Sequence, residues 1–299
     1  MPDYLRIYAR QEYLTPGAAE TVELIAETVG PSADALLLEV AAGKGEAACT
    51  LAGRFACRVL AVELFDPFVQ YAAAKVWHWN LRDLVTVLRA DGKHVPLRDA
   101  ACDAAYSIGA ASIVGLEPCL AELARAVREG GHVIVSDVVW RAKPETPVGP
   151  EWRYIATIEP KLSAEEYAAA MEAAGLRVER VHLHDPSAWE EYFRPMLRVA
   201  EEAKTSQPAD IAFADEVESG VELERRAVEA AGLRVERVHL HDRSAWEEYW
   251  RPMLQVAQEA KIAQPADILF ADEVESSVEL ERRAVEAWLD YATFVARRP

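Results

Sequence analysis

The stretch that decides the fold is Leu36–Glu63, which reads LLLEVAAGKGEAACTLAGRFACRVLAVE. It begins with an apolar run, Leu36–Val40, and continues through a glycine turn into a helical pattern at Glu46–Arg54. A second apolar run, Arg58–Val62, stops at an acid, Glu63. The order strand, glycine turn, helix, strand and acid is typical of a nucleotide-binding βαβ unit.

The turn has the chemistry that a cofactor site needs. Gly43 and Gly45 carry no Cβ atom that would keep a ligand off the backbone, and the N-terminus of the next helix presents unpaired N–H groups there. Glu63 follows Gly43 by 63 − 43 = 20 positions, the spacing typical of a carboxylate that binds two ribose hydroxyls. A dinucleotide site has a third glycine for close helix packing, and Ala48 at that place could serve. A lone glycine turn also occurs as a tight strand-to-helix loop, which is the structural alternative.

The segment Glu39–Gly45 resembles the first motif of class I S-adenosylmethionine (SAM)-dependent methyltransferases, in which an acid precedes a glycine-rich turn. The resemblance covers about residues 15–140 and points to the small-molecule group that includes ubiquinone and menaquinone methyltransferases, the type 11 group. It implies that Glu39 lies near the amino-acid end of SAM and that Glu63 holds the ribose. The chain departs from the family at Ala41, where a glycine is usual.

The resemblance also implies an adenine contact. Asp91 follows a predicted strand, Leu84–Arg89, where the family has an acid that accepts a hydrogen bond from the adenine amino group. An Asp-Gly turn is the structural alternative. The predicted cofactor-binding residues are Glu39, Ala41, Gly43, Gly45, Glu63, Leu64, Asp91, Gly92 and Ser107.

The acceptor is expected at the carboxyl end of the next predicted strand, Cys102–Ser107, because open α/β sheets bind ligands at that edge. Tyr106 on this strand is a candidate acceptor contact, as are Trp140 and Arg141 after the predicted strand His132–Val138. The chemistry that the resemblance implies is in-line displacement at the sulfonium methyl group. The sequence identifies no catalytic base.

The resemblance implies an α/β fold class: a Rossmann-like, doubly wound, mostly parallel seven-stranded sheet whose last strand, here Leu289–Arg297, is antiparallel. We expect residues 1–150 to form the SAM-binding core with an N-terminal helical cover. We expect residues 151–299 to complete the core and to carry a duplicated helical insertion. Helices are predicted at Ala18–Val29, Phe68–Trp79, Glu117–Arg128 and Ser163–Ala174, the third of them ended by Gly130 and Gly131.

The C-terminal half contains a tandem duplication, residues 172–228 and 229–285, offset by 230 − 173 = 57 positions. Each copy has a strand candidate, Leu176–His184 or Leu233–His241, followed by two acidic amphipathic helices. We expect the first copy to supply strand six. The second copy is then a helical arm, through which we predict a homodimer.

Each copy also contains the sequence HLHD. His182 and His184 share one face of a strand, and so do His239 and His241. This spacing occurs in metal sites, but the repeat supplies no convincing third ligand, so no metal site is predicted.

The composition of the chain bears on its partners and on its cellular compartment. The net charge of −18 argues against nucleic acid and anionic membranes as partners. The four cysteines show no CxxC pairing, and the N-terminus has charges where a signal peptide is apolar, so we expect a soluble cytoplasmic protein. A SAM-dependent enzyme with a small-molecule acceptor is the first hypothesis. A SAM-binding scaffold whose duplicated acidic helices form an interaction surface is the alternative.

Overall fold

The computed structural model describes residues 4–141, 162–204 and 289–299. By compactness the chain divides into two units, Glu12–Phe193 with Glu279–Pro299, and Met1–Gln11 with Arg194–Val278. Of the second unit the described residues include helix α1 (Tyr4–Arg10) and the later part of α9 (Ser187–Lys204). The second copy of the repeat, with its expected arm, lies outside the described residues.

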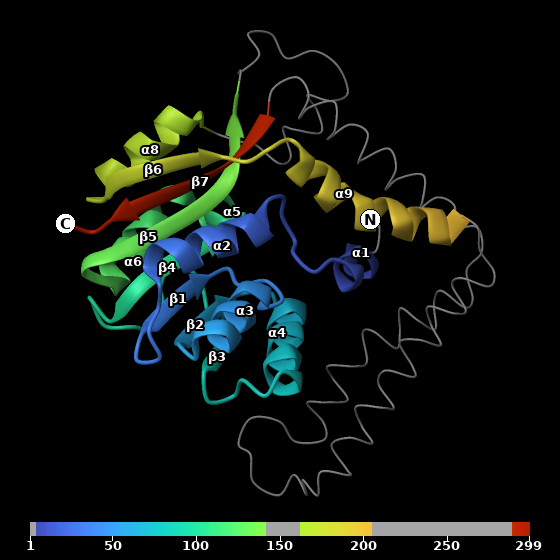
Figure 1. Ribbon diagram of the computed structural model, residues 1–299, viewed down its shortest axis with the longest axis horizontal. Coiled ribbons are helices and arrows are strands. Elements are labelled where there is room, and N and C mark those ends of the chain that lie inside the picture. The colour runs from blue at the N-terminus through green and yellow to red at the C-terminus, as the bar shows by residue number, and fades with distance from the viewer. Residues whose placement is uncertain (1–3, 142–161, 205–288) are drawn as a thin grey trace, which may run out of the picture. The chain divides into compact units, whose positions relative to one another are not determined.

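The first unit is built on a seven-stranded sheet of strand order β3-β2-β1-β4-β5-β7-β6 (Figure 1). Strands β1 to β5 pair in parallel, and β7 runs antiparallel to both β5 and β6. This topology confirms the predicted fold class. The strands are β1 (Leu36–Val40), β2 (Arg58–Glu63), β3 (Val85–Arg89), β4 (Cys102–Ile108), β5 (Val127–Trp140), β6 (Arg177–Leu183) and β7 (Leu289–Arg297).

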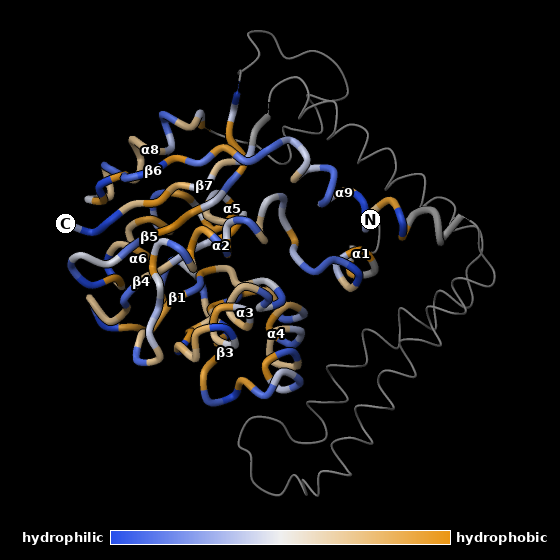
Figure 2. Tube along the Cα trace, in the orientation of Figure 1, coloured by the Kyte–Doolittle hydropathy of each residue, from blue (hydrophilic) through white to orange (hydrophobic). Residues whose placement is uncertain are grey.

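Helices cover both faces of the sheet, and Figure 2 shows hydrophilic and hydrophobic residues alternating along their turns. One core joins the sheet to α2 (Ala18–Val29), α3 (Glu46–Phe55) and α4 (Asp66–His78). The other core joins it to α6 (Leu116–Ala126) and α8 (Ala164–Ala173). Successive strand residues face opposite cores, as Leu37 and Leu38 do, because side chains alternate along a strand.

The first copy of the repeat supplies strand six, as predicted, because β6 pairs with β7. The predicted end of the helix before β5 was wrong. Helix α6 ends at Ala126, and β5 begins at once at Val127. The pairing with β4 then jumps from Val127 to His132, so the intervening residues bulge. Gly131 lies in this bulge. The position requires a glycine, because a Cβ there would lie 2.5 Å from the Asp103 carbonyl oxygen.

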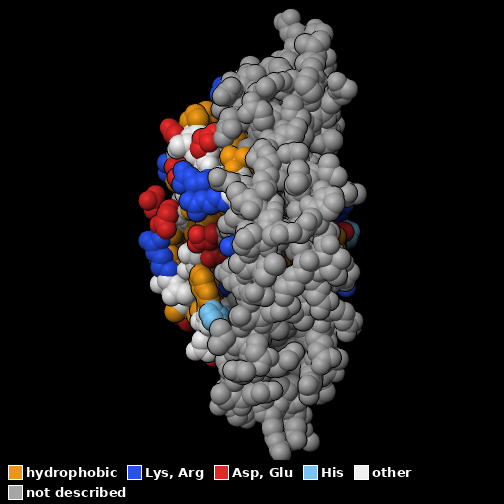
Figure 3. All heavy atoms as spheres, turned by 90° about the vertical axis from the view of Figure 1, so that its right-hand side faces the viewer, with side chains coloured by type: hydrophobic (Ala, Val, Ile, Leu, Met, Phe, Trp, Pro, Cys, Tyr) orange, Lys and Arg blue, Asp and Glu red, His pale blue; other side chains and the backbone are white. Residues whose placement is uncertain are grey.

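Two further features concern the ends and the surface of the described elements. Helix α8 begins with a capping box, in which Ser163 and Glu166 each accept from the other's backbone N–H. No helix in the described ranges is at once long and apolar enough to cross a bilayer. Figure 3 shows acidic and basic side chains interleaved on the described surface that faces the viewer.

Candidate functional site

The turn between β1 and α3 has three residues in the left-handed region of backbone space. Gly43 and Gly45 have φ of +54° and +74°, and Ala41 has φ of +57°. A Cβ on Gly45 would lie 2.9 Å from the Cβ of Ala72 in α4, so α3 and α4 pack closely only with glycine there. The turn therefore requires its two glycines. Ala41 adopts a conformation that a glycine adopts at lower cost.

Glu63 binds this turn from the end of β2. Its Oε2 accepts from the N–H of Gly43 at 2.8 Å, and its Oε1 accepts from the N–H groups of Leu64 and Phe65, each at 2.8 Å. The residue is buried. A carboxylate has about four acceptor positions, so three backbone bonds leave capacity for a ligand hydroxyl. Acid and turn therefore form one preorganised surface.

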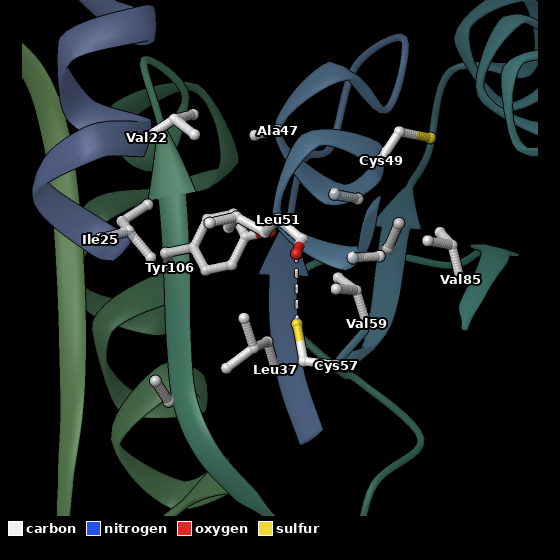
Figure 4. Packing of buried hydrophobic residues seen from close by; sticks show 14 of the residues in the cluster. Val22, Ile25, Leu37, Ala47, Cys49, Leu51, Cys57, Val59, Val85 and Tyr106 are labelled. Carbon is white, nitrogen blue, oxygen red and sulfur yellow. Dashed lines mark hydrogen bonds between the residues drawn. The ribbon is translucent and has the colours of Figure 1, made fainter. Parts of the chain in front are cut away.

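Glu39 lies in the core beneath the same turn. Burial raises its pKa to about 8, the charge of Glu63 adds to the rise, and a hydrogen bond from Tyr106 counteracts it. The Tyr106 hydroxyl donates to Oε2 of Glu39 at 3.3 Å. Figure 4 shows the Tyr106 ring packed among Ile25, Leu37 and Leu51. The structure thus places Tyr106 in the core, where it orients Glu39, and gives its side chain no exposed position beside an acceptor.

Two lysines accompany these acids, Lys44 buried and Lys75 partly buried, and sequence reasoning missed both. Burial lowers the pKa of Lys44 in the turn to about 8, and it lowers the pKa of Lys75 in α4 to about 8 as well. Lys75 pairs with Glu46 at the start of α3. The region around the turn therefore contains ionisable groups of both signs in a partly desolvated setting.

The predicted adenine side has a turn and an apolar surface. Oδ1 of Asp91 accepts from the N–H of Lys93 at 3.0 Å, which is the Asp-Gly turn of the structural alternative. A Cβ on Gly92 would lie 2.5 Å from Cγ1 of Val40, so the glycine brings the chain after β3 against the end of β1. Leu64, next to Glu63, is 57% exposed and offers an apolar face beside the ribose acid.

An N-terminal segment, residues 12–17, crosses the carboxyl edge of the sheet and is called the cover segment below. A Cβ on Gly43 would lie 3.2 Å from Cδ1 of Leu14. A Cβ on Gly109, which follows β4, would lie 2.4 Å from Oγ1 of Thr15. The cover segment therefore contacts the glycine turn and the end of β4, the two places where cofactor and acceptor are expected.

The cover segment also contacts strands β5 and β7 and the end of β6. Thr15 donates to the Tyr291 hydroxyl in β7 at 3.0 Å, and that hydroxyl lies 3.1 Å from Oγ of Ser136 in β5. Gly17 lies against the His184 imidazole, since a Cβ there would be 2.5 Å from Nδ1. These contacts were not predicted. The local sequence Thr15-Pro16-Gly17 indicates a turn but not what the turn touches.

The remaining predicted residues lie on β4 and β5. Ser107 is fully buried, and its side chain lies beside the Cys119 thiol of α6, so only its backbone is at the carboxyl edge. Trp140 is buried at the end of β5, where its backbone N–H donates to the Leu162 carbonyl oxygen at 2.9 Å. Arg141 follows it and is exposed. Trp140 and Arg141 lie together, whereas the Ser107 side chain faces the helix layer.

Asp137, also on β5, was not singled out as a site residue. Its carboxylate accepts from the N–H groups of Ser112 and Val138, each at 2.9 Å, and from the Tyr167 hydroxyl at 3.4 Å. Burial raises its pKa, and these hydrogen bonds counteract the rise. The acid fixes the short helix α5 (Ala111–Val114) against the end of β5.

Comparisons with known proteins identify the core. A family model described as a methyltransferase domain matches residues 38–135. The chain is 26% identical over 169 residues to Methyltransferase GfsG of Streptomyces halstedii, an alignment that covers 54% of this chain and 60% of that protein. It is 26% identical over 129 residues to an uncharacterized protein of Haemophilus influenzae, covering 42% of this chain and 51% of that one.

The fold has solved counterparts. A SAM-dependent methyltransferase from Thiobacillus denitrificans, in complex with S-adenosyl-L-homocysteine, superposes with a TM-score of 0.59 over 99% of this chain and 98% of that chain, at 19% identity. The chain spans about half to three fifths of the length of the two sequence relatives. The matched domain runs from β1 into β5 and includes the glycine turn and Glu63. Residues 38–135 therefore match a methyltransferase domain, and the sheet that contains them has the fold of a solved SAM-dependent methyltransferase.

Proposed function

We propose that the chain binds SAM across the glycine turn and transfers the methyl group to a small-molecule acceptor. The observation that carries the proposal is the buried carboxylate of Glu63, which accepts from Gly43 at 2.8 Å and retains acceptor capacity for a ribose hydroxyl. The acid is fixed before any ligand arrives, which lowers the cost of ordering the site.

The other predicted contacts extend from this anchor. Glu39, beneath the turn, accepts from the ammonium group of SAM, and its raised pKa means that SAM binding favours its ionised form. The exposed Leu64 packs on the adenosine, and Asp91 accepts from the adenine amino group. Each of these roles extends the family resemblance to a residue of this chain.

When bound, SAM would supply a sulfonium methyl group: an acceptor lone pair forms a bond to the methyl carbon while the C–S bond breaks, and its electrons stay on the sulfur of the departing S-adenosylhomocysteine. The protein contributes position, because in-line alignment of the two reactants accounts for a large share of such a rate enhancement. The cover segment, held by Leu14 and Thr15, limits water access over the turn and the end of β4. We assign no general base, and an acceptor proton passes to solvent.

The class of acceptor, the oligomeric state and the location are also proposals. The acceptor is a small molecule, and the quinone-methyltransferase subgroup is one candidate for its class. A homodimer through the duplicated segment remains a prediction, since the second copy of the repeat is outside the described residues. A cytoplasmic location also remains a prediction.

Calorimetric titration of SAM and S-adenosylhomocysteine into the wild type and Glu63→Ala tests the proposal. We expect micromolar binding to the wild type and at least tenfold weaker binding to the variant. Glu129→Ala, which removes an exposed acid far along the chain, is the matched control and should bind as the wild type does. No binding to the wild type would refute the proposal. Binding without turnover on any acceptor class would favour the scaffold hypothesis.

A further inference from the structure

Three side chains from distant parts of the chain meet beside the end of the cover segment. Glu20 comes from the first turn of α2, His182 comes from the carboxyl end of β6, and His184 directly follows that strand. One Glu20 oxygen lies 2.8 Å from Nε2 of His182, and the other lies 2.7 Å from Nδ1 of His184. One ligand atom from each residue lies within 4.8 Å of the other two.

The hydroxyl groups around His184 favour one assignment of its ring proton. Thr21 donates its only hydroxyl proton to the Gly17 carbonyl at 3.0 Å. Between Thr21 and Thr293, 3.0 Å apart, the donor must therefore be Thr293. The Thr293 oxygen, 2.7 Å from Nε2 of His184, can then only accept, so Nε2 carries the hydrogen.

This assignment leaves Nδ1 of His184 with a lone pair that points at a carboxylate oxygen 2.7 Å away. Two acceptors at this distance repel unless a cation lies between them. A second proton on the ring would supply one. A metal ion bound by both atoms is the other such cation, and it would also take the His182 nitrogen, since all three ligand atoms lie within 4.8 Å of one another.

We propose that Glu20, His182 and His184 bind a divalent transition-metal ion, and that Zn²⁺ matches the site best. Two imidazole nitrogens and one carboxylate are a common zinc ligand set. The Thr293 hydroxyl that holds Nε2 of His184 is the outer hydrogen bond that metal-binding histidines usually make. The proposal concerns a different part of the sheet edge from the glycine turn and does not depend on SAM binding.

To admit the ion, the Glu20 oxygens must move away from the two ring nitrogens, while the three ligand atoms, now within 4.8 Å of one another, converge on one centre. Tetrahedral zinc with ligands at about 2.0–2.1 Å places neighbouring ligand atoms about 3.3 Å apart, somewhat more than the present 2.7 and 2.8 Å. The Glu20 side chain is 48% exposed and that of His182 is 23% exposed, so both can move outward. The same exposure leaves the fourth position open to water or another ligand.

The ion would link α2 to strand β6, and it would thereby hold the end of the cover segment, which leads into α2. Glu20 and His182 are 162 positions apart, so the metal would link segments that sequence proximity does not hold together. This distance also explains why the repeat alone gave no metal prediction. The missing third ligand lies outside the repeat.

Titration of ZnCl₂ into chelator-treated full-length protein, followed by calorimetry, is the first test. We expect one tight site in the wild type and at least tenfold weaker binding in Glu20→Gln, His182→Gln and His184→Gln. The double variant His239→Gln/His241→Gln, which changes the matching positions of the second copy, should retain that site. Zinc binding that survives the first three substitutions, or that depends on the second copy alone, would overturn the proposal.

A second measurement needs no variant. Crystals of the wild type grown with ZnCl₂ should show an anomalous peak at the zinc absorption edge among Glu20, His182 and His184. Absence of the peak at saturating zinc would overturn the proposal. So would ¹⁵N NMR signals showing that His184 is doubly protonated in the zinc-treated protein, because a proton would then bridge the contact.

Discussion

Replacement of Glu39 by glutamine should remove a pH dependence from the stability of the fold. Burial raises the pKa of Glu39 to about 8 in the folded protein, against about 4.3 for an unfolded glutamate. Between these values the folded state binds a proton that the unfolded state does not. The contribution of Glu39 to stability is therefore fully present below about pH 4.3 and is lost as the pH rises toward about 8.

The size of the effect follows from linkage. In that window the free energy of unfolding falls by about 1.4 kcal/mol per pH unit, so the rise from pH 6.0 to 7.5 costs the wild type about 2 kcal/mol. The amide introduced by Glu39→Gln does not titrate, and its oxygen can still accept from Tyr106. Lys44 and Lys75, whose lowered pKa values are about 8, affect stability mainly above this window.

Urea unfolding followed by circular dichroism, with linear extrapolation at pH 6.0, 6.5, 7.0 and 7.5, measures the difference. We expect the wild type to lose about 2 kcal/mol more than Glu39→Gln across the range. Glu129→Gln, at an exposed acid, is the control and should follow the wild type. Parallel pH profiles for the wild type and Glu39→Gln would mean that Glu39 is ionised in the fold, and the burial argument would be wrong.

Four further substitutions test the turn, the cover segment and its contact with β7. Ala41→Gly should raise the free energy of unfolding by about 0.5–1 kcal/mol, because φ is +57° there, and a drop in urea midpoint would contradict this. Gly109→Ala, whose Cβ would lie 2.4 Å from Thr15, should weaken SAM binding at least tenfold in calorimetry. The double variant Thr15→Gly/Gly109→Ala should recover part of the lost SAM affinity. Wild-type affinity in Gly109→Ala would show that the cover segment does not affect SAM binding. Tyr291→Phe should cost about 1–2 kcal/mol in thermal unfolding, because it removes the hydroxyl shared by Thr15 and Ser136, and an unchanged melting temperature would argue against that network.

The parts of the fold that the sequence predicts well are those with a local signal. Strand, glycine turn, helix and acid follow one another within Leu36–Glu63, and periodicity alone separates them. The boundary between α6 and β5 was mispredicted because Gly130 and Gly131 are typical of a helix end. In the structure they belong to a bulge, which is set by the pairing of β5 with β4 and has no signature in the local sequence.

The candidate site divides in the same way. Glu63 and Gly43 were singled out from their spacing within one βαβ unit, and the structure places them in direct contact, whereas the ribose-binding role of Glu63 stays a prediction. Thr15 and Tyr291 are 276 positions apart, and neither belongs to a motif, so their contact required the fold. Tyr106 was assigned to the acceptor from its place on β4, although strand alternation puts its side chain on the α2–α3 face.

The central claim is that Glu63 and the glycine turn hold the adenosine part of SAM. A crystal structure of the wild type with S-adenosylhomocysteine tests it most directly. The account predicts a ribose hydroxyl within hydrogen-bond distance of the Glu63 carboxylate, with the ligand backbone over Gly43 and Gly45. Ligand density elsewhere on the molecule, with Glu63 bonded only to the backbone groups of Gly43, Leu64 and Phe65, would contradict the claim.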